Sequence, residues 1–123
     1  MTEELTAETR EAVDRFNDAF GRHDVDAVMA NMTDDCVFEN TSPPDGQRYE
    51  GQAAVRAAWE EFFGGSPDAV FDTEDLFVAE DRCVLRWRYR FKNADGSDGH
   101  VRGVDLIRVR DGRVAEKLSY VKG

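Results

Sequence analysis

Apolar side chains in the first half of the chain recur every three or four positions, which is the spacing of one buried helix face. The recurrence covers three segments: residues 6–21, 24–32 and 51–63. Gly21 and the pair Gly64 and Gly65 follow the first and third segments, where glycine favours the end of a helix. The pattern therefore predicts three N-terminal helices.

The pattern of the remaining chain predicts strands. Residues 36–40 form a short apolar run that ends at Pro43 and Pro44, because proline cannot donate to a strand ladder. Beyond Pro67 the apolar period changes to two, which predicts four more strands: residues 69–79, 82–93, 100–111 and 113–121. Helices followed by hairpin-linked strands indicate an α+β fold, with the helices packed on one face of a mainly antiparallel sheet.

One predicted strand, residues 83–91, alternates large apolar residues with arginines. Its two faces carry Leu85, Trp87, Tyr89 and Phe91 on one side and Arg86, Arg88 and Arg90 on the other. Taken alone, this alternation buries the aromatic residues and exposes the arginines. If a second subunit covers the outside of a curved sheet, the arginines instead point into a cavity and the aromatic residues form a dimer surface. The sequence leaves both orientations open.

Length and composition limit the possible classes of protein. With 123 residues the chain is large enough for one domain with a core and too small for two, so we expect a single domain over residues 1–123. No apolar run approaches the ~20 residues that span a bilayer, and the N-terminus lacks the pattern of a signal peptide. We therefore expect a cytoplasmic protein, in which Cys36 and Cys83 are reduced core thiols.

The formal net charge of −10 repels phosphate backbones and anionic lipids, so neither nucleic acid nor membrane is expected as a partner. The acidic residues concentrate in residues 1–81 and the basic ones in residues 82–123, which favours contact between the two parts unless both sets are simply solvated. His23 and His100 show no metal-ligand spacing, and no glycine-rich phosphate loop is present. No metal or cofactor is expected, and His100 is interpreted as a surface residue.

Three stretches in this order resemble the NTF2-like superfamily, and the branch is similar to SnoaL-like polyketide cyclases and ketosteroid isomerase. They are residues 33–40 (TDDCVFEN), 49–55 (YEGQAAV) and 103–116 (GVDLIRVRDGRVAE). The resemblance covers essentially the whole chain and implies a cone-shaped fold, or cystatin-like roll, with three helices packed on a curved sheet. This scaffold hosts isomerases, cyclases, dehydratases, epoxide hydrolases and non-catalytic binders, so the fold does not specify the reaction.

The resemblance also implies roles for individual residues. Asn40 stands where ketosteroid isomerase has its general base, and Phe16 stands where that enzyme has a tyrosine. An amide cannot accept a proton at neutral pH, and a phenyl ring has no hydroxyl to donate to an oxyanion, so the isomerase mechanism is not supported. Asp105 matches the remaining aspartate and corresponds to the acid/base residue of SnoaL-like cyclases. Asp105 is therefore the expected catalytic residue, with Asn40 donating a hydrogen bond to an enolate.

If Asp105 faces inward, strand alternation also places Gly103 and Ile107 inward. The resemblance implies that Lys117 and Ser119 face the same interior. The expected cavity has an apolar wall and a few polar contacts, as small-molecule sites do. Its residues are Phe16, Phe38 and Trp59 for the wall, and Asn40, Asp105, Lys117, Ser119 and Arg88 for the polar contacts. Two structural alternatives stay open: a buried ion network that only fixes the sheet, and a core role for Trp59.

The sequence thus predicts a small-molecule-binding protein that performs cofactor-independent acid/base chemistry on a partly apolar carbonyl compound, as an isomerase, cyclase or dehydratase. One alternative is a non-catalytic ligand-binding or dimerisation module. Another is an epoxide hydrolase, in which Arg86 or Arg88 supplies the guanidinium, although Ser119 replaces an expected aspartate. A homodimer is expected through the outer sheet face, which is predicted to carry Trp87, Tyr89, Val104, Leu106 and Tyr120.

Overall fold

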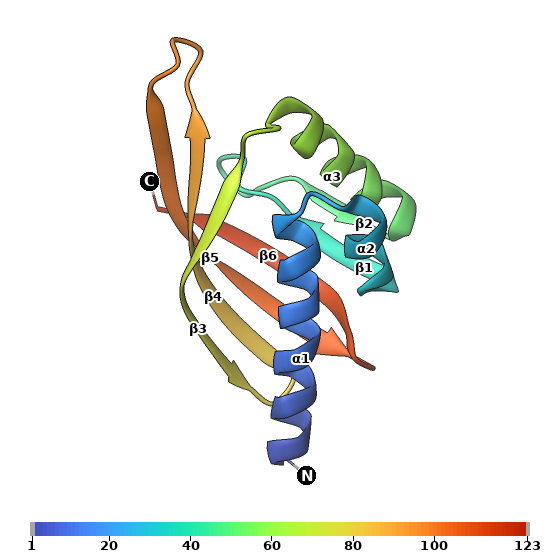
Figure 1. Ribbon diagram of the computed structural model, residues 1–123. Coiled ribbons are helices and arrows are strands. Elements are labelled where there is room, and N and C mark those ends of the chain that lie inside the picture. Colours follow the sequence, from blue (N-terminus) through green and yellow to red (C-terminus); the bar gives the residue numbers. More distant parts are fainter. Residues whose placement is uncertain (1, 123) are drawn as a thin grey trace.

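The computed structural model describes residues 2–122, and in it helices pack against one side of a single curved sheet (Figure 1). In chain order the elements are α1 (Thr2–Gly21), α2 (Val25–Ala30), β1 (Met32–Glu39), β2 (Arg48–Glu50), α3 (Gln52–Gly65), β3 (Val70–Ala79), β4 (Arg82–Lys92), β5 (Asp98–Arg110) and β6 (Arg113–Val121). The strand order is β2-β1-β6-β5-β4-β3. All neighbouring strands are antiparallel except β1 and β6, which are parallel. The predicted α+β architecture is confirmed.

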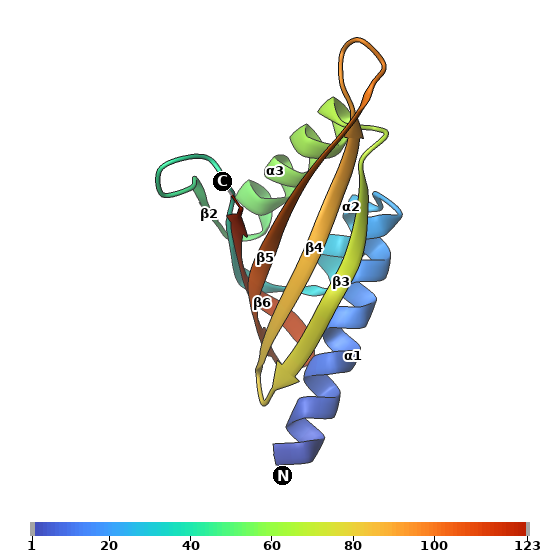
Figure 2. The ribbon, with the colours of Figure 1, turned by 90° about the vertical axis from the view of Figure 1, so that its left-hand side faces the viewer.

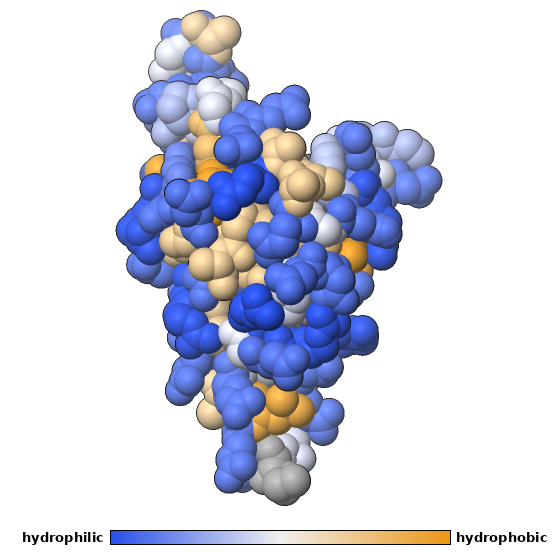
Figure 3. Space-filling model, turned by 90° about the vertical axis from the view of Figure 1, so that its right-hand side faces the viewer, coloured by the Kyte–Doolittle hydropathy of each residue, from blue (hydrophilic) through white to orange (hydrophobic). Residues whose placement is uncertain are grey.

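The helices use the apolar spacing seen in the sequence. The buried face of α1 consists of Thr9, Ala12, Val13, Phe16, Ala19 and Phe20. Helix α2 begins after Asp24, whose side chain accepts a hydrogen bond of 3.1 Å from the backbone N–H of Ala27. Helix α3 buries Val55, Trp59 and Phe63 against the same core. Seen from the helix side, the molecule presents a largely hydrophilic surface (Figure 3).

Most predicted boundaries shift by a few residues, such as the start of α1 at Thr2 and of β5 at Asp98, and three other differences concern β1, β2 and the end of α3. Strand β1 begins at Met32 rather than at residue 36. The sequence prediction missed its first residues because the consecutive exposed residues Asp34 and Asp35 interrupt the alternation of buried and exposed positions. Strand β2 has three residues and was not predicted, since so short a segment has no detectable period. Helix α3 continues through Gly64 and Gly65 instead of ending before them.

The register of β4 and β5 decides which side chains face the helices. Leu85 pairs with Asp105 and Trp87 pairs with Gly103, so these side chains share the inner face of the sheet, which the helices cover. Trp87 is 7% exposed. Trp87 and Tyr89 therefore do not belong to the outer surface, and that part of the dimer prediction is wrong.

The opposite, outer face carries the arginines of β4. Arg86 pairs with Val104 and Arg88 pairs with Arg102, and all of them point away from the helices. Figure 2 looks onto this face, with α1 and α3 behind the strands. The simple alternation, with aromatic residues inside and arginines outside, is therefore the correct interpretation of this strand.

Gly103 allows the Trp87 ring to lie close to the sheet. A Cβ atom at position 103 would collide with the Trp87 ring and with the carbonyl oxygen of Tyr120. Glycine at this position therefore has a packing reason that does not depend on its backbone torsions. It lets a large indole form part of the inner surface at the centre of the sheet.

Both cysteines are free and buried, as expected. Burial raises the pKa of the Cys83 thiol to about 11, and it also raises the pKa of Cys36. Across residues 2–122, no helix combines the length and the apolar character that a membrane crossing requires.

Candidate functional site

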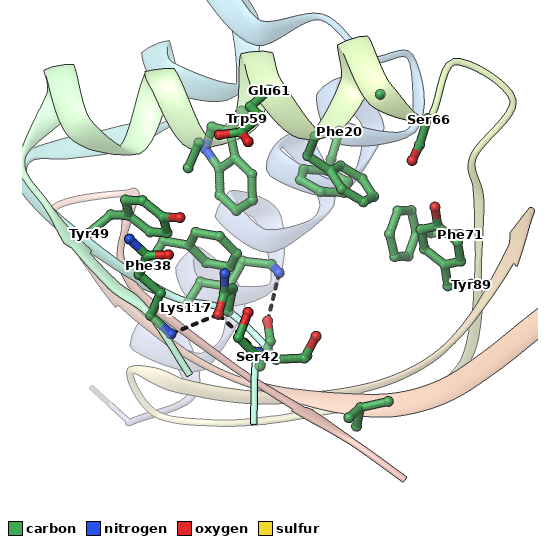
Figure 4. Close-up of a pocket in the computed structure, with 18 of the residues that line it drawn as sticks. Phe20, Phe38, Ser42, Tyr49, Trp59, Glu61, Ser66, Phe71, Tyr89 and Lys117 are labelled. Atoms are coloured by element: carbon green, nitrogen blue, oxygen red, sulfur yellow. Dashed lines mark hydrogen bonds between the residues drawn. The ribbon is translucent and has the colours of Figure 1, made fainter. Parts of the chain in front are cut away.

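A cavity of about 620 Å³ lies between α3, the end of α1 and the inner face of the sheet (Figure 4). Its size falls within the range of ligand pockets, about 300–1,000 Å³. We call it the main cavity. Aromatic side chains from six elements supply much of its wall: Phe20, Phe38, Tyr49, Trp59, Phe62, Phe71, Trp87 and Tyr89.

The aromatic wall is held by contacts among its own members. The Phe20 ring lies 5.2 Å from the Trp59 ring at 88° and 5.3 Å from the Phe71 ring at 70°. The Phe38 and Trp59 ring centroids are 4.1 Å apart. Edge-to-face and offset contacts of this kind fix ring orientations. The wall is therefore an ordered apolar surface rather than a collection of mobile side chains.

Lys117, on β6, brings a positive charge to the floor of this apolar cavity. Its Nζ donates to Ser119 Oγ at 3.1 Å and lies 3.2 Å from Asp105 Oδ2. The same nitrogen lies 5.4, 5.1 and 5.5 Å from the ring centroids of Phe20, Phe38 and Trp59. An ammonium has three N–H donors, so the contacts to Ser119 and Asp105 leave one for the side on which the rings lie.

Asp105, on β5, is the third member of the network that Lys117 and Ser119 form. Its side chain is 4% exposed, and its Oδ1 accepts a hydrogen bond of 2.7 Å from the Ser119 hydroxyl. A buried carboxylate requires such partners, because an unpaired charge in the interior is costly. The three residues therefore form one connected unit, in which Ser119 donates to Asp105 and Lys117 donates to Ser119.

Asp105 does not line the main cavity. It lines a separate pocket of about 70 Å³ between α1 and strands β3, β4 and β5, together with Asn17 and Thr73. Lys117 lines both spaces, and Ser119 lines the main cavity. Any ligand in the main cavity therefore meets Lys117 and Ser119 directly and Asp105 only through them.

Asn40 lies at the rim and organises the segment that follows β1. Its side-chain oxygen accepts hydrogen bonds from the backbone N–H groups of Ser42, at 3.0 Å, and Gln47, at 2.7 Å. Gly46 has φ +82, and a Cβ there would collide with the carbonyl oxygen of Asn40. The Asn40 oxygen thus holds residues 40–47 in place as part of the cavity wall, and the amide nitrogen of the same side chain is left for other contacts.

The other expected site residues divide into three groups. Phe38 and Trp59 line the main cavity, and Trp59 is also a core residue that is 2% exposed. Phe16 is fully buried and lines only the small pocket. Arg88 lies on the outer face and lines neither space, so its expected contact with a ligand in the cavity is corrected by the strand register.

The histidines lie outside the main cavity. His23 Nε2 lies 2.9 Å from the carbonyl oxygen of Ala69, and its ring stacks on Phe63. His100 is exposed, as expected of a surface residue. Within residues 2–122, no cluster of histidine, cysteine and acidic side chains is arranged to hold a metal ion.

Sequence reasoning missed six aromatic residues of the wall: Phe20, Tyr49, Phe62, Phe71, Trp87 and Tyr89. For Trp87 and Tyr89, the length of the predicted hairpin could have shown that they face the interior. The turn between β4 and β5 is centred near Asp95, and a hairpin closed there pairs residue 85 with residue 105. That pairing places the aromatic residues of β4 on the same face as Asp105.

Comparisons with known proteins agree on the family and the fold. The SnoaL-like domain family matches residues 13–117. The crystal structure of an NTF2-like protein of unknown function from Mesorhizobium loti is 45% identical, with a TM-score of 0.81 over 96% of this chain and 93% of that chain. A search of curated proteins found no match.

Two further crystal structures share the fold at lower identity. A candidate ketosteroid isomerase from Kribbella flavida is 18% identical, with a TM-score of 0.84 over 100% of this chain and 82% of that chain. A candidate SnoaL-like polyketide cyclase from Jannaschia sp. is 23% identical, with a TM-score of 0.82 over 96% of this chain and 88% of that chain.

Proposed function

The chain belongs to the SnoaL-like domain family, and we propose that its main cavity binds a small, partly apolar carbonyl compound and performs cofactor-independent acid/base chemistry on it. The observation that supports this most directly is the buried Lys117–Ser119–Asp105 network at the floor of an aromatic cavity. The reaction is of the isomerase, cyclase or dehydratase type, because all three begin by removing a proton from the carbon next to a carbonyl group.

In the proposed reaction the aromatic wall holds the apolar part of the substrate. The carbonyl oxygen of the substrate accepts a hydrogen bond from the remaining N–H of Lys117. Negative charge develops on that oxygen as the neighbouring carbon loses its proton, and the fixed ammonium stabilises it. Lys117 thereby takes the role that the sequence assigned to Asn40. Asn40 contributes by holding residues 40–47 as the wall beside the substrate.

The proton leaves through Ser119. The serine oxygen receives the proton from carbon while the serine O–H proton moves to Asp105 Oδ1, along the hydrogen bond of 2.7 Å. Asp105 becomes the neutral acid, and the substrate becomes the enolate beside Lys117, so charge and protons balance. Asp105 is thus the acid/base group of the reaction, acting through one hydroxyl. The same path in reverse returns the proton to a different atom in an isomerisation.

A second candidate function, binding without catalysis, is favoured by a specific observation. Asp105 lines the small pocket and not the main cavity, so no carboxylate touches the ligand space from the floor. In this case the network serves only to neutralise a buried ammonium. Chemistry of the epoxide hydrolase type is not proposed, because Arg86 and Arg88 both lie on the outer face.

A ligand screen followed by isotope exchange separates the two functions. Carbonyl compounds that raise the melting temperature are incubated with the protein in D2O, and loss of the proton next to the carbonyl is followed by ¹H NMR. An enzyme accelerates this exchange, and Asp105→Asn lowers the rate by about 10²-fold or more, the usual contribution of a general base. Binding without accelerated exchange supports the non-catalytic candidate. Absence of any stabilising carbonyl compound contradicts both.

We also propose a homodimer through the outer face of the sheet. This face exposes Leu106 (37%) and Tyr120 (50%), and Val104 and Leu118 lie between them. Basic residues of β4 and β5 on the same face alternate with acidic residues such as Glu74 and Glu116. A two-fold arrangement can therefore bring opposite charges together. Strands β3 to β6, with 9 to 13 residues each, present about 700 Å². Each partner buries about 800 Å² in an interface of standard size, so this face is close to the required area.

Sedimentation velocity tests the dimer with a matched pair of variants. Leu106→Lys places a charge in the proposed interface and is expected to give a monomer at micromolar concentration. Leu5→Lys changes an equally exposed leucine (39%) on α1, outside the interface, and is expected to leave the dimer intact. A monomeric parent protein, or equal behaviour of the two variants, contradicts the proposal.

A further inference from the structure

We infer that the main cavity selects neutral carbonyl compounds over carboxylates of the same shape, which rests on the ligand-binding function proposed above. The inference comes from the charges around Lys117. A lysine at the floor of an apolar cavity suggests a site for an organic anion at first sight. Here the ammonium already has its anion, because Asp105 Oδ2 lies 3.2 Å from Nζ and both side chains are at most 9% exposed.

A carboxylate ligand would add a second negative charge beside the Lys117–Asp105 pair. Two carboxylates would then share one ammonium in a space walled by aromatic rings, and the incoming ion would also lose its hydration. Apart from Lys117, the charged residue that lines the main cavity is Glu61, an exposed acid on α3. With Asp105 behind the floor, the charges nearest the ligand sum to about −1, which disfavours an anion.

A neutral carbonyl compound avoids these costs. Its oxygen accepts a charge-assisted hydrogen bond from the remaining N–H of Lys117, and its apolar part stays against the aromatic rings. Negative charge reaches that oxygen only when a proton has moved to Asp105, so the number of charges in the cavity does not rise. The net charge of −10 further lowers the concentration of anions near the surface.

A pair of nearly isosteric probes measures this selectivity. 2-Acetylnaphthalene and 2-naphthoate share the same bicyclic ring and differ by a methyl group in place of a negatively charged oxygen. Isothermal titration calorimetry gives both dissociation constants. The parent protein is expected to bind the ketone about tenfold more tightly or better, because one like charge within 4–6 Å changes such equilibria by that factor or more.

Asp105→Asn is the decisive variant, because it keeps the shape of the side chain and removes its charge. Lys117 is then an unneutralised ammonium, so the affinity for 2-naphthoate is expected to rise about tenfold or more, which removes the preference for the ketone. Arg88→Gln, on the outer face, is the matched control and is expected to leave the ratio of the two dissociation constants unchanged.

The outcomes separate this inference from the function on which it rests. If both probes bind and the parent protein does not prefer the ketone, the selectivity is overturned while ligand binding stands. If Asp105→Asn leaves the ratio unchanged, the assignment of the selectivity to the Lys117–Asp105 pair is overturned, and ligand binding again stands. If neither probe binds at millimolar concentration, the binding function is overturned, and the selectivity with it. Should Asp105→Asn fail to fold by circular dichroism, the ratio in the parent protein decides alone.

Discussion

The ion pairs on the two faces of the sheet differ in how far they are exposed to water. On the inner face the Lys117–Asp105 pair has side chains that are 9% and 4% exposed, and aromatic rings surround the ammonium. On the outer face Arg90 pairs with Asp72 at 2.6 Å, but these side chains are 48% and 41% exposed. Water screens the outer pair and leaves it worth little, whereas the inner pair must stay matched. Similar ion pairs therefore have different consequences, and the candidate site lies where charge is scarce.

Removing one member of the inner pair tests this difference most strongly. Lys117→Met leaves Asp105 buried without its cation and is expected to lower the free energy of unfolding by about 3–5 kcal/mol. Chemical denaturation measures the loss. The control is Arg90→Met, which removes the cation of the exposed pair with Asp72 and for which a much smaller change is expected. Equal losses in the two variants would contradict the proposed contrast between the faces.

Packing also differs between the two faces of the sheet. Substitutions at two neighbouring residues of β5 measure this difference. Gly103→Ala adds a Cβ that collides with the Trp87 ring and the Tyr120 carbonyl, so a loss of about 2–3 kcal/mol is expected. Val104→Ala, on the outer face, removes atoms from a half-buried position and should cost about 1 kcal/mol or less. Urea denaturation gives both values, and a harmless Gly103→Ala would show that Trp87 can move.

The buried thiol on the inner face predicts an alkaline limit to stability. Burial raises the pKa of Cys83 from 9.0 to about 11. The folded protein thus holds this proton more tightly than the unfolded chain does. The resulting stability is complete below pH 9 and is lost as the pH rises to about 11. The difference in unfolding free energy between parent and Cys83→Ala should therefore shrink by about 2 kcal/mol over this interval. A constant difference would refute the prediction.

The rim of the inner face should show the smallest effect. Asn40→Ala removes the acceptor of two backbone N–H groups and is expected to cost about 1 kcal/mol and to weaken ligand binding. Asn40→Asp keeps an oxygen at that place and should retain most of the stability. Thermal denaturation compares the two variants. If they lose the same stability, the acceptor is not what holds residues 40–47.

Much of the fold follows from local pattern. The helices and the four long strands have clear periods, and Asp111–Gly112 marks the last turn. Strand alternation also placed Gly103, Asp105 and Ile107 correctly on one face. Strand β2 had no such signal, because its three residues are defined by their pairing with β1. Its contribution to the cavity, Tyr49, was missed with it.

The candidate site was harder to predict, because its contacts join distant parts of the chain. The resemblance to the NTF2-like superfamily placed Asn40 at the cavity but did not indicate the hydrogen bonds that its oxygen accepts from Ser42 and Gln47. The resemblance also placed Asp105, Lys117 and Ser119 in one interior, but it did not indicate the order in which they face a ligand. That order depends on side-chain conformations that the strand period does not determine.

The parallel pairing of β1 with β6 has a consequence for how the site is assembled. It joins Phe38 with Lys117, residues almost eighty positions apart in the chain. Synthesis runs from the N-terminus, so the helices and β1 leave the ribosome before β6 does. A nascent chain that lacks β6 has its aromatic wall uncovered at the floor and has neither the ammonium nor the serine. The ligand site should therefore form only after β6 has left the ribosome and paired with β1.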